Sequence, residues 1–128
     1  MQEQQITSWV ENGPQPDFLQ AAEELGRDLK NNKLSTSQIR QVFTRLKSIE
    51  AKGYTGRRTD FMMLKPYLAY AAGRQQKIRG LQTFKDKITC GIDAVLAGGS
   101  EAEEQQRFNN FCKLFEAVLA YHRASGGK

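Results

Sequence analysis

The chain has 128 residues and only three prolines, with polar and apolar residues interleaved at helical spacing, which predicts one folded domain and argues against extended disorder. No apolar run approaches the roughly 18 residues needed to cross a bilayer, and the first residues lack the pattern of a secretion signal. We therefore expect a cytoplasmic protein with no membrane partner. The net charge of +5 is concentrated in residues 40–87, which hold 12 of the 19 Lys and Arg but only three of the 14 Asp and Glu.

Residues 1–15 are polar and include the loop-forming run Asn12-Gly13-Pro14, so we expect a flexible lead-in. Its apolar residues are expected to dock as no more than a short turn: Ile6, Trp9 and Val10. The folded domain is predicted over residues 16–124. Residues 125–128 are expected to fray.

Apolar residues recur at helical spacing in five stretches of the domain. The predicted helices cover residues 16–31, 35–52, 59–74, 80–97 and 100–124. Ser35 with Gln38, and Ser100 with Glu103, have the spacing of a capping box at the start of a helix. No stretch alternates like a strand, so the sequence predicts an all-α, single-domain bundle of about five helices whose short connections favour antiparallel neighbours.

The stretch from residue 59 to residue 80 carries both an apolar helical stripe and several cations. Pro66 interrupts it, because proline lacks an N–H and biases the preceding Lys65 away from the helical region. The helix therefore either starts near Lys65 or kinks there, and the sequence does not choose between these alternatives.

Residues suited to catalysis or metal binding are few. His122 is the single histidine, and its place in the last turn of a helix suits a dipole-stabilised or core-edge role. Cys90 and Cys112 fall on apolar helical stripes, which favours buried thiols over a disulfide. These three residues lack the paired spacing and the fourth ligand of a structural zinc site. We expect a protein that is not an enzyme and that needs no metal or cofactor.

Binding is the remaining function class, and the basic segment is the candidate surface. Cations interleaved with aromatic residues suit single-stranded nucleic acid, whose phosphates are neutralised while its bases stack. The aromatic residues are Tyr54, Phe61, Tyr67 and Tyr70, and each tyrosine is more simply explained as a packing residue. The candidate cations are Lys52, Arg57, Arg58, Lys65, Arg74, Lys77 and Arg79. The alternative is a solvated face that binds nothing.

Three blocks of the sequence resemble the small subunit of type III-A CRISPR effector complexes, the Csm small subunit. They are Leu-Ser-Thr-Ser-Gln-Ile-Arg at residues 34–40, Leu-Lys-Pro-Tyr-Leu-Ala-Tyr-Ala-Ala-Gly-Arg at residues 64–74, and the run from Phe111 that ends Phe-Glu-Ala-Val-Leu-Ala-Tyr-His. The resemblance covers roughly residues 17–124 in the same order, and its middle block is the most specific.

The resemblance implies a small helical subunit that stacks in several copies along the effector complex, against its backbone and large subunits. It also implies contacts with the sugar-phosphate chain of guide (crRNA) and target RNA, without sequence specificity and without catalysis, in antiviral defence. The matched blocks themselves supply Arg40, Lys65 and Arg74, whereas the other candidate cations rest on charge alone. Two alternatives stay open: a helical DNA-binding regulator whose residues 35–52 read the major groove, and a protein adaptor with solvated cations.

Overall fold

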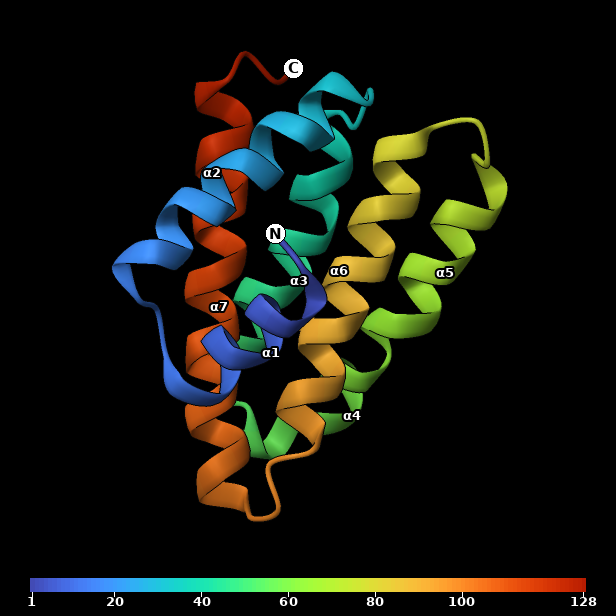
Figure 1. The fold of residues 1–128 in the computed structure, drawn as a ribbon. Helices are drawn as coiled ribbons and strands as arrows, with labels where there is room; N and C mark the ends of the chain where they lie inside the picture. Colours follow the sequence, from blue (N-terminus) through green and yellow to red (C-terminus); the bar gives the residue numbers. More distant parts are fainter.

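The computed structural model describes all 128 residues and contains seven α-helices, one 3₁₀ turn and no strand (Figure 1). The helices are α1 (Glu3–Asn12), α2 (Pro16–Asn31), α3 (Thr36–Lys52), α4 (Arg58–Met62), α5 (Leu64–Arg74), α6 (Arg79–Leu96) and α7 (Glu101–Ala124), and the 3₁₀ turn η1 covers Thr55–Arg57. The all-α prediction is confirmed. Four of the five expected helices correspond to α2, α3, α6 and α7. The remaining one, predicted over residues 59–74, is divided into α4 and α5.

The longest helix, α7, runs the length of the bundle, and most of the other helices pack against it (Figure 1). Helices α2, α6 and α1 pack along it, α1 bridges α6 and α7, and α5 lies against the outer side of α6. The centre of the core is aromatic: Phe61 of α4 meets Phe108 and Phe111 of α7 edge to face, with ring centroids 5.3 and 5.4 Å apart. None of the helices is long and apolar enough to span a bilayer.

Residues 3–12 correct the prediction of a flexible lead-in, because they form helix α1 and dock on the core. Ile6, Trp9 and Val10 are all buried on one side of this helix. The indole N–H of Trp9 donates to the carbonyl of Asn110 over 3.1 Å, and the Asn110 side-chain amide donates to the carbonyl of Val10 over 2.9 Å. A helix this short is stabilised by packing rather than by intrinsic propensity, which is why its polar composition was misleading.

The last four residues also differ from the expectation of fraying. The N–H of Gly127 donates to the carbonyl of His122 over 3.0 Å, and the N–H of Thr36 donates to the carbonyl of Lys128 over 2.7 Å. The tail therefore supplies an acceptor to the first turn of α3, where backbone N–H groups have no partner within the helix. His122 lies in the core rather than at its edge, with Nε2 2.7 Å from the carbonyl oxygen of Leu34.

The break between α4 and α5 resolves the alternatives left open by Pro66. The helix stops at Met62 and α5 begins at Leu64, so Pro66 stands in the first turn of the new helix, where a missing N–H costs nothing. Continuing α4 through this point would press the proline ring against the carbonyl of Met62.

Both predicted helix starts are confirmed. The N–H of Gln38 donates to Oγ of Ser35 over 3.1 Å, and the N–H of Ser35 donates to Oε1 of Gln38 over 3.0 Å, which completes the capping box of α3. At α7, the N–H of Glu103 donates to Oγ of Ser100 over 3.1 Å. The cysteines are both free, as predicted; Cys112 is buried, whereas Cys90 is only half-buried and departs from the expected burial.

Candidate nucleic-acid interface

Side chains of α3 and α5 meet at the surface of the bundle. Each helix buries one stripe of side chains in the core. Beside that stripe, each helix carries a row of side chains next to the junction between the two helices, and successive members of each row are four, three and four residues apart in the sequence. We call these rows the α3–α5 face; it comprises Gln41, Arg45, Ser48 and Lys52 of α3, Met63 just before α5, and Tyr67, Tyr70 and Arg74 of α5. Tyr67 joins the rows, because its hydroxyl donates to Oε1 of Gln41 over 3.1 Å and the Arg45 guanidinium lies 4.0 Å from its ring centroid.

Apolar and aromatic side chains are unusually open on this side of the molecule. Tyr70 is 66% exposed and Met63 is 58% exposed, and with Met62 they make up three of the four large apolar residues that the fold leaves exposed. The Arg74 guanidinium lies 5.5 Å from the centroid of the Tyr70 ring. A hollow of about 230 Å³ adjoins Met63, and it is lined by Arg45, Ser48, Ile49, Asp60, Met63 and Leu64.

The tyrosines of the basic segment divide into two classes. Tyr54 is only 2% exposed and stacks on Phe108 with ring centroids 4.7 Å apart, so the packing interpretation is confirmed for it. Tyr67 is half-buried between α3 and α5. The packing interpretation is wrong for Tyr70, which has solvent over most of its side chain.

Arg58 is exposed but is paired with a carboxylate of the same chain. Its Nε donates to Oε1 of Glu104 over 2.8 Å and its Nη2 to Oε2 over 3.3 Å, while the hydroxyl of Tyr54 donates to the same carboxylate over 2.8 Å. The hydrogen bonds from Arg58 hold the pKa of Glu104 below its ordinary value. Burial, reinforced by the hydrogen bond to Glu104, raises the pKa of Tyr54. This cluster ties the segment after α3 to the first turn of α7.

Lys65 is also paired within the chain, because its Nζ lies 2.6 Å from Oδ1 of Asp93 on α6. Arg57 has a looser partner in Asp60, at 3.8 Å. Arg57, Arg58 and Lys65 therefore each have a carboxylate of the same chain beside them. A partner would have to compete with those carboxylates for them.

Five of the eight predicted cations are exposed and have no carboxylate within ion-pair distance: Arg40, Lys52, Arg74, Lys77 and Arg79. The structure does not bring all of them together. Lys52 and Arg74 lie at opposite ends of the α3–α5 face, Arg40 lies on the outer side of α3, and Lys77 and Arg79 lie at the turn between α5 and α6. Sequence reasoning missed Arg45, whose spacing from Gln41 and Lys52 along α3 was the available signal.

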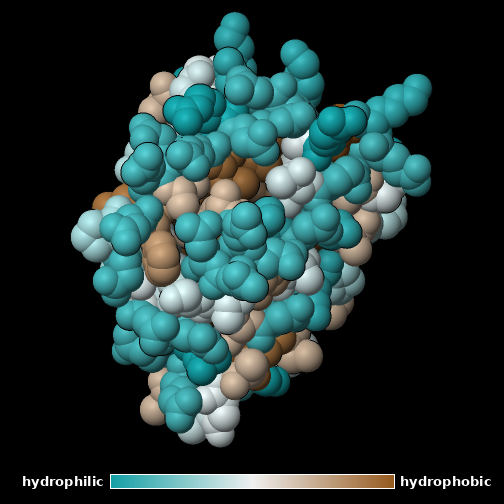
Figure 2. Space-filling model, viewed as in Figure 1, coloured by the Kyte–Doolittle hydropathy of each residue, from teal (hydrophilic) through white to brown (hydrophobic).

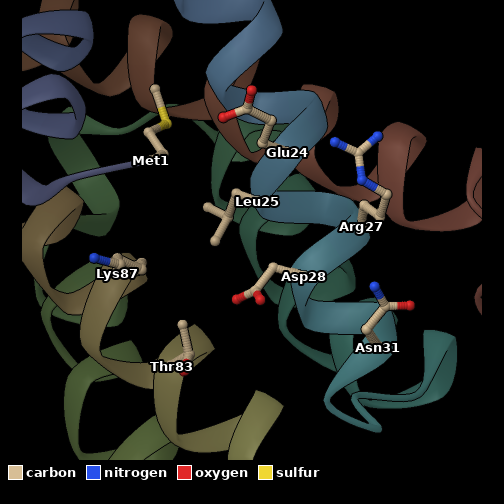
Figure 3. A pocket seen from close by; sticks show the side chains of 8 residues that line it. All are labelled: Met1, Glu24, Leu25, Arg27, Asp28, Asn31, Thr83 and Lys87. Carbon is tan, nitrogen blue, oxygen red and sulfur yellow. The ribbon is translucent and has the colours of Figure 1, made fainter.

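A second hollow lies on the side of the molecule shown in Figures 1 and 2, where the surface is mostly hydrophilic. It has a volume of about 530 Å³ and opens between α2, α6 and the start of the chain; Figure 3 shows its lining residues, Met1, Glu24, Leu25, Arg27, Asp28, Asn31, Thr83 and Lys87. Its charges have mixed sign, and it contains no nucleophile beside a base. The chain as a whole brings together no group of three His, Cys, Asp or Glu that would hold a metal ion.

Comparison with known proteins places the chain in a family. The family model described as Csm2 Type III-A matches residues 14–128, which include every helix except α1. A curated relative, the CRISPR system Cms protein Csm2 of Enterococcus italicus, is 29% identical over 100 residues, which cover 70% of this chain and 66%, just under two thirds, of the relative. No solved structure matches the chain. The resemblance of the three sequence blocks is confirmed, and the chain belongs to the Csm2 Type III-A family.

Proposed function

We propose that the chain is a non-catalytic small subunit of a type III-A CRISPR effector complex. In this proposal several copies stack against one another and against the backbone and large Csm subunits. Each copy contacts the phosphates of guide and target RNA without reading their bases. Membership of the Csm2 family supports the assignment to the complex.

The unpaired cations carry the RNA contact. Arg40, Arg74, Lys77 and Arg79 have no carboxylate partner within the chain, so phosphates can bind them without displacing an internal ion pair. Neutralising phosphates with Lys and Arg releases counterions from the nucleic acid, and binding then weakens steeply with salt and hardly depends on sequence.

The DNA-binding regulator is disfavoured by the surroundings of α3. A helix-turn-helix reader places the N-terminal residues of its recognition helix against base edges. At the start of α3, however, Thr36 is buried and its N–H is bonded to the chain's own tail at Lys128. Part of the first turn that would have to enter a major groove is therefore covered by the chain's own tail.

A pair of double charge reversals tests the proposal. Arg74→Glu with Lys77→Glu removes two unpaired cations of the basic segment, and Arg27→Glu with Lys113→Glu makes the same change in net charge on α2 and α7. Each tagged variant is purified gently from its own cells, and co-eluting proteins and RNA are identified before and after nuclease treatment. We expect the first variant to lose RNA and the second to retain it, with equal helical content by circular dichroism.

Two results would count against the proposal. Equal RNA retention by both variants would remove the phosphate contact from this segment. Elution of the wild-type chain as a lone monomer or dimer, without RNA or other Csm proteins, would favour the adaptor and the regulator instead.

A further inference from the structure

Phosphate contacts do not explain the exposure of Tyr70. This tyrosine stands in the middle of α5, where a polar side chain would serve a purely electrostatic surface equally well, yet 66% of it is open to solvent. Met63, which immediately precedes α5, lies seven residues earlier and is similarly open. Large apolar side chains left exposed among polar residues are candidates for a binding site.

The surroundings of Tyr67 show what an aromatic ring on this face does when it has a partner. The planar Arg45 guanidinium covers the Tyr67 ring at 4.0 Å, and the hydroxyl of Tyr67 donates a hydrogen bond to Oε1 of Gln41. Tyr70 lies one turn further along and has only Arg74 beside its ring, at 5.5 Å, with no hydrogen-bond partner for its hydroxyl. Its ring is therefore available to another planar group.

The charges of the face indicate what kind of molecule brings that group. Arg45 and Arg74 lie on the α3–α5 face beside Tyr67 and Tyr70, and neither has an ion-pair partner, whereas Asp60 is the single carboxylate that lines the adjoining hollow. An unpaired nucleotide offers both parts of the complement, a flat base for the ring and a phosphate for the guanidinium. A basic protein surface would be repelled.

We infer that Tyr70, with Arg74 beside it, stacks on an unpaired base of single-stranded RNA. This inference rests on the proposed function and adds to it a contact with a base, made through its π-face and independent of its identity. Base stacking on an aromatic side chain strengthens binding by about 5- to 100-fold per base, and every base has a face to offer. The stacking contribution is insensitive to salt, whereas the Arg74 contribution is not.

Ultraviolet crosslinking of the RNA-containing particle tests the contact directly. The particle is purified through the tagged full chain, irradiated at 254 nm, and digested with nuclease and trypsin. The peptide of interest covers residues 59–74, because trypsin does not cut between Lys65 and Pro66. We expect a nucleotide adduct on this peptide, localised to Tyr70 by fragmentation and absent from Tyr70→Leu. Adducts confined to other parts of the chain would overturn the stacking and leave the phosphate contacts in place.

Binding of the full chain to two 12-residue probes gives the magnitude. One probe is oligoadenylate and the other has the same ribose-phosphate backbone without bases. We expect Tyr70→Ala to weaken oligoadenylate binding by about 5- to 100-fold, to leave abasic binding unchanged and to keep the salt slope. Tyr70→Phe should match the wild type. Leu19→Ala, which trims another exposed apolar residue on α2, is the control and should bind both probes normally.

The outcomes separate the two proposals. If Tyr70→Ala binds both probes like the wild type while binding stays salt-dependent, the stacking is wrong and the phosphate contact stands. If the mutation instead strips a Csm protein from the particle while its RNA remains, Tyr70 faces a protein and the stacking is wrong. If the wild-type particle contains no RNA, the stacking and the RNA contact of the proposed function fail together.

Discussion

The same substitution at two helical glycines should change stability in opposite directions. A Cβ atom added at Gly26 of α2 would lie 2.6 Å from the backbone nitrogen of His122 and 2.9 Å from the carbonyl carbon of Tyr121, both in α7. A Cβ atom added at Gly73 of α5 would meet no atom within 4 Å. The first contact is with backbone, which cannot rotate away as a side chain does.

The magnitudes follow from two competing terms. Alanine favours a helix over glycine by about 0.5–1 kcal/mol, and at Gly73 this gain is unopposed. At Gly26 the gain is opposed by overpacking, which costs about 1–3 kcal/mol even where side chains can adjust. We therefore expect Gly73→Ala to raise the free energy of unfolding by about 0.5–1 kcal/mol and Gly26→Ala to lower it by up to about 2.5 kcal/mol.

Urea denaturation followed by circular dichroism at 222 nm measures both changes. The midpoint should move up for Gly73→Ala and down for Gly26→Ala, with an unchanged slope in each case, because neither variant alters the surface exposed on unfolding. Stabilisation of similar size in both variants would refute the close contact of α2 with α7.

Three further predictions concern α1, the Arg58 cluster and the thiols. Trp9→Ala should lower the free energy of unfolding, measured by urea denaturation, by about 3–5 kcal/mol. Trp9→Phe keeps much of the packing but loses the indole hydrogen bond, and should lower it by less. If neither variant changed the free energy of unfolding, residues 1–15 would be a free lead-in. The pKa of Glu104 is depressed by Arg58, so its contribution is complete above the ordinary glutamate pKa of 4.5 and is lost as the pH falls further. Thermal unfolding at pH 7 and pH 3.5 should therefore show a smaller acid-induced loss in Glu104→Gln than in the wild type, and equal losses would contradict the pairing. Burial raises the pKa of the Cys112 thiol, so iodoacetamide should label Cys90 in the folded protein and Cys112 only after denaturation. Mass spectrometry of the labelled peptides measures the order, and labelling of Cys112 before Cys90 would contradict the burial.

Helix boundaries were predictable where the deciding hydrogen bonds are local. The start of α3 depends on two bonds between Ser35 and Gln38, three residues apart, and both residues are visible in the sequence as a capping box. The start of α1 also has a local bond, from the N–H of Gln2 to Oε1 of Gln5 over 2.8 Å, but its docking on the core depends on distant residues. Trp9 is buried because it packs against Asn110 and its neighbours in α7, and no feature of residues 1–15 predicts that contact.

The candidate site was predictable as a charge distribution but not as a geometry. The concentration of cations between residues 40 and 87 is a property of composition. Which cations remain free depends on long-range pairs, since Arg58 meets Glu104 46 residues away and Lys65 meets Asp93 28 residues away. Arg45 became a candidate only when α5 placed Tyr67 beneath its guanidinium.

The contact between Trp9 and Asn110 also bears on how the chain is made. The two residues are 101 positions apart, and ribosomes add about 5–20 residues per second, so α1 is synthesised about 5–20 s before its docking site on α7 exists. During that interval the tryptophan is exposed to solvent and to other nascent chains. The contact of Trp9 with α7 must therefore await synthesis of that helix, and a translational pause ahead of α7 would prolong the period in which Trp9 lacks this partner.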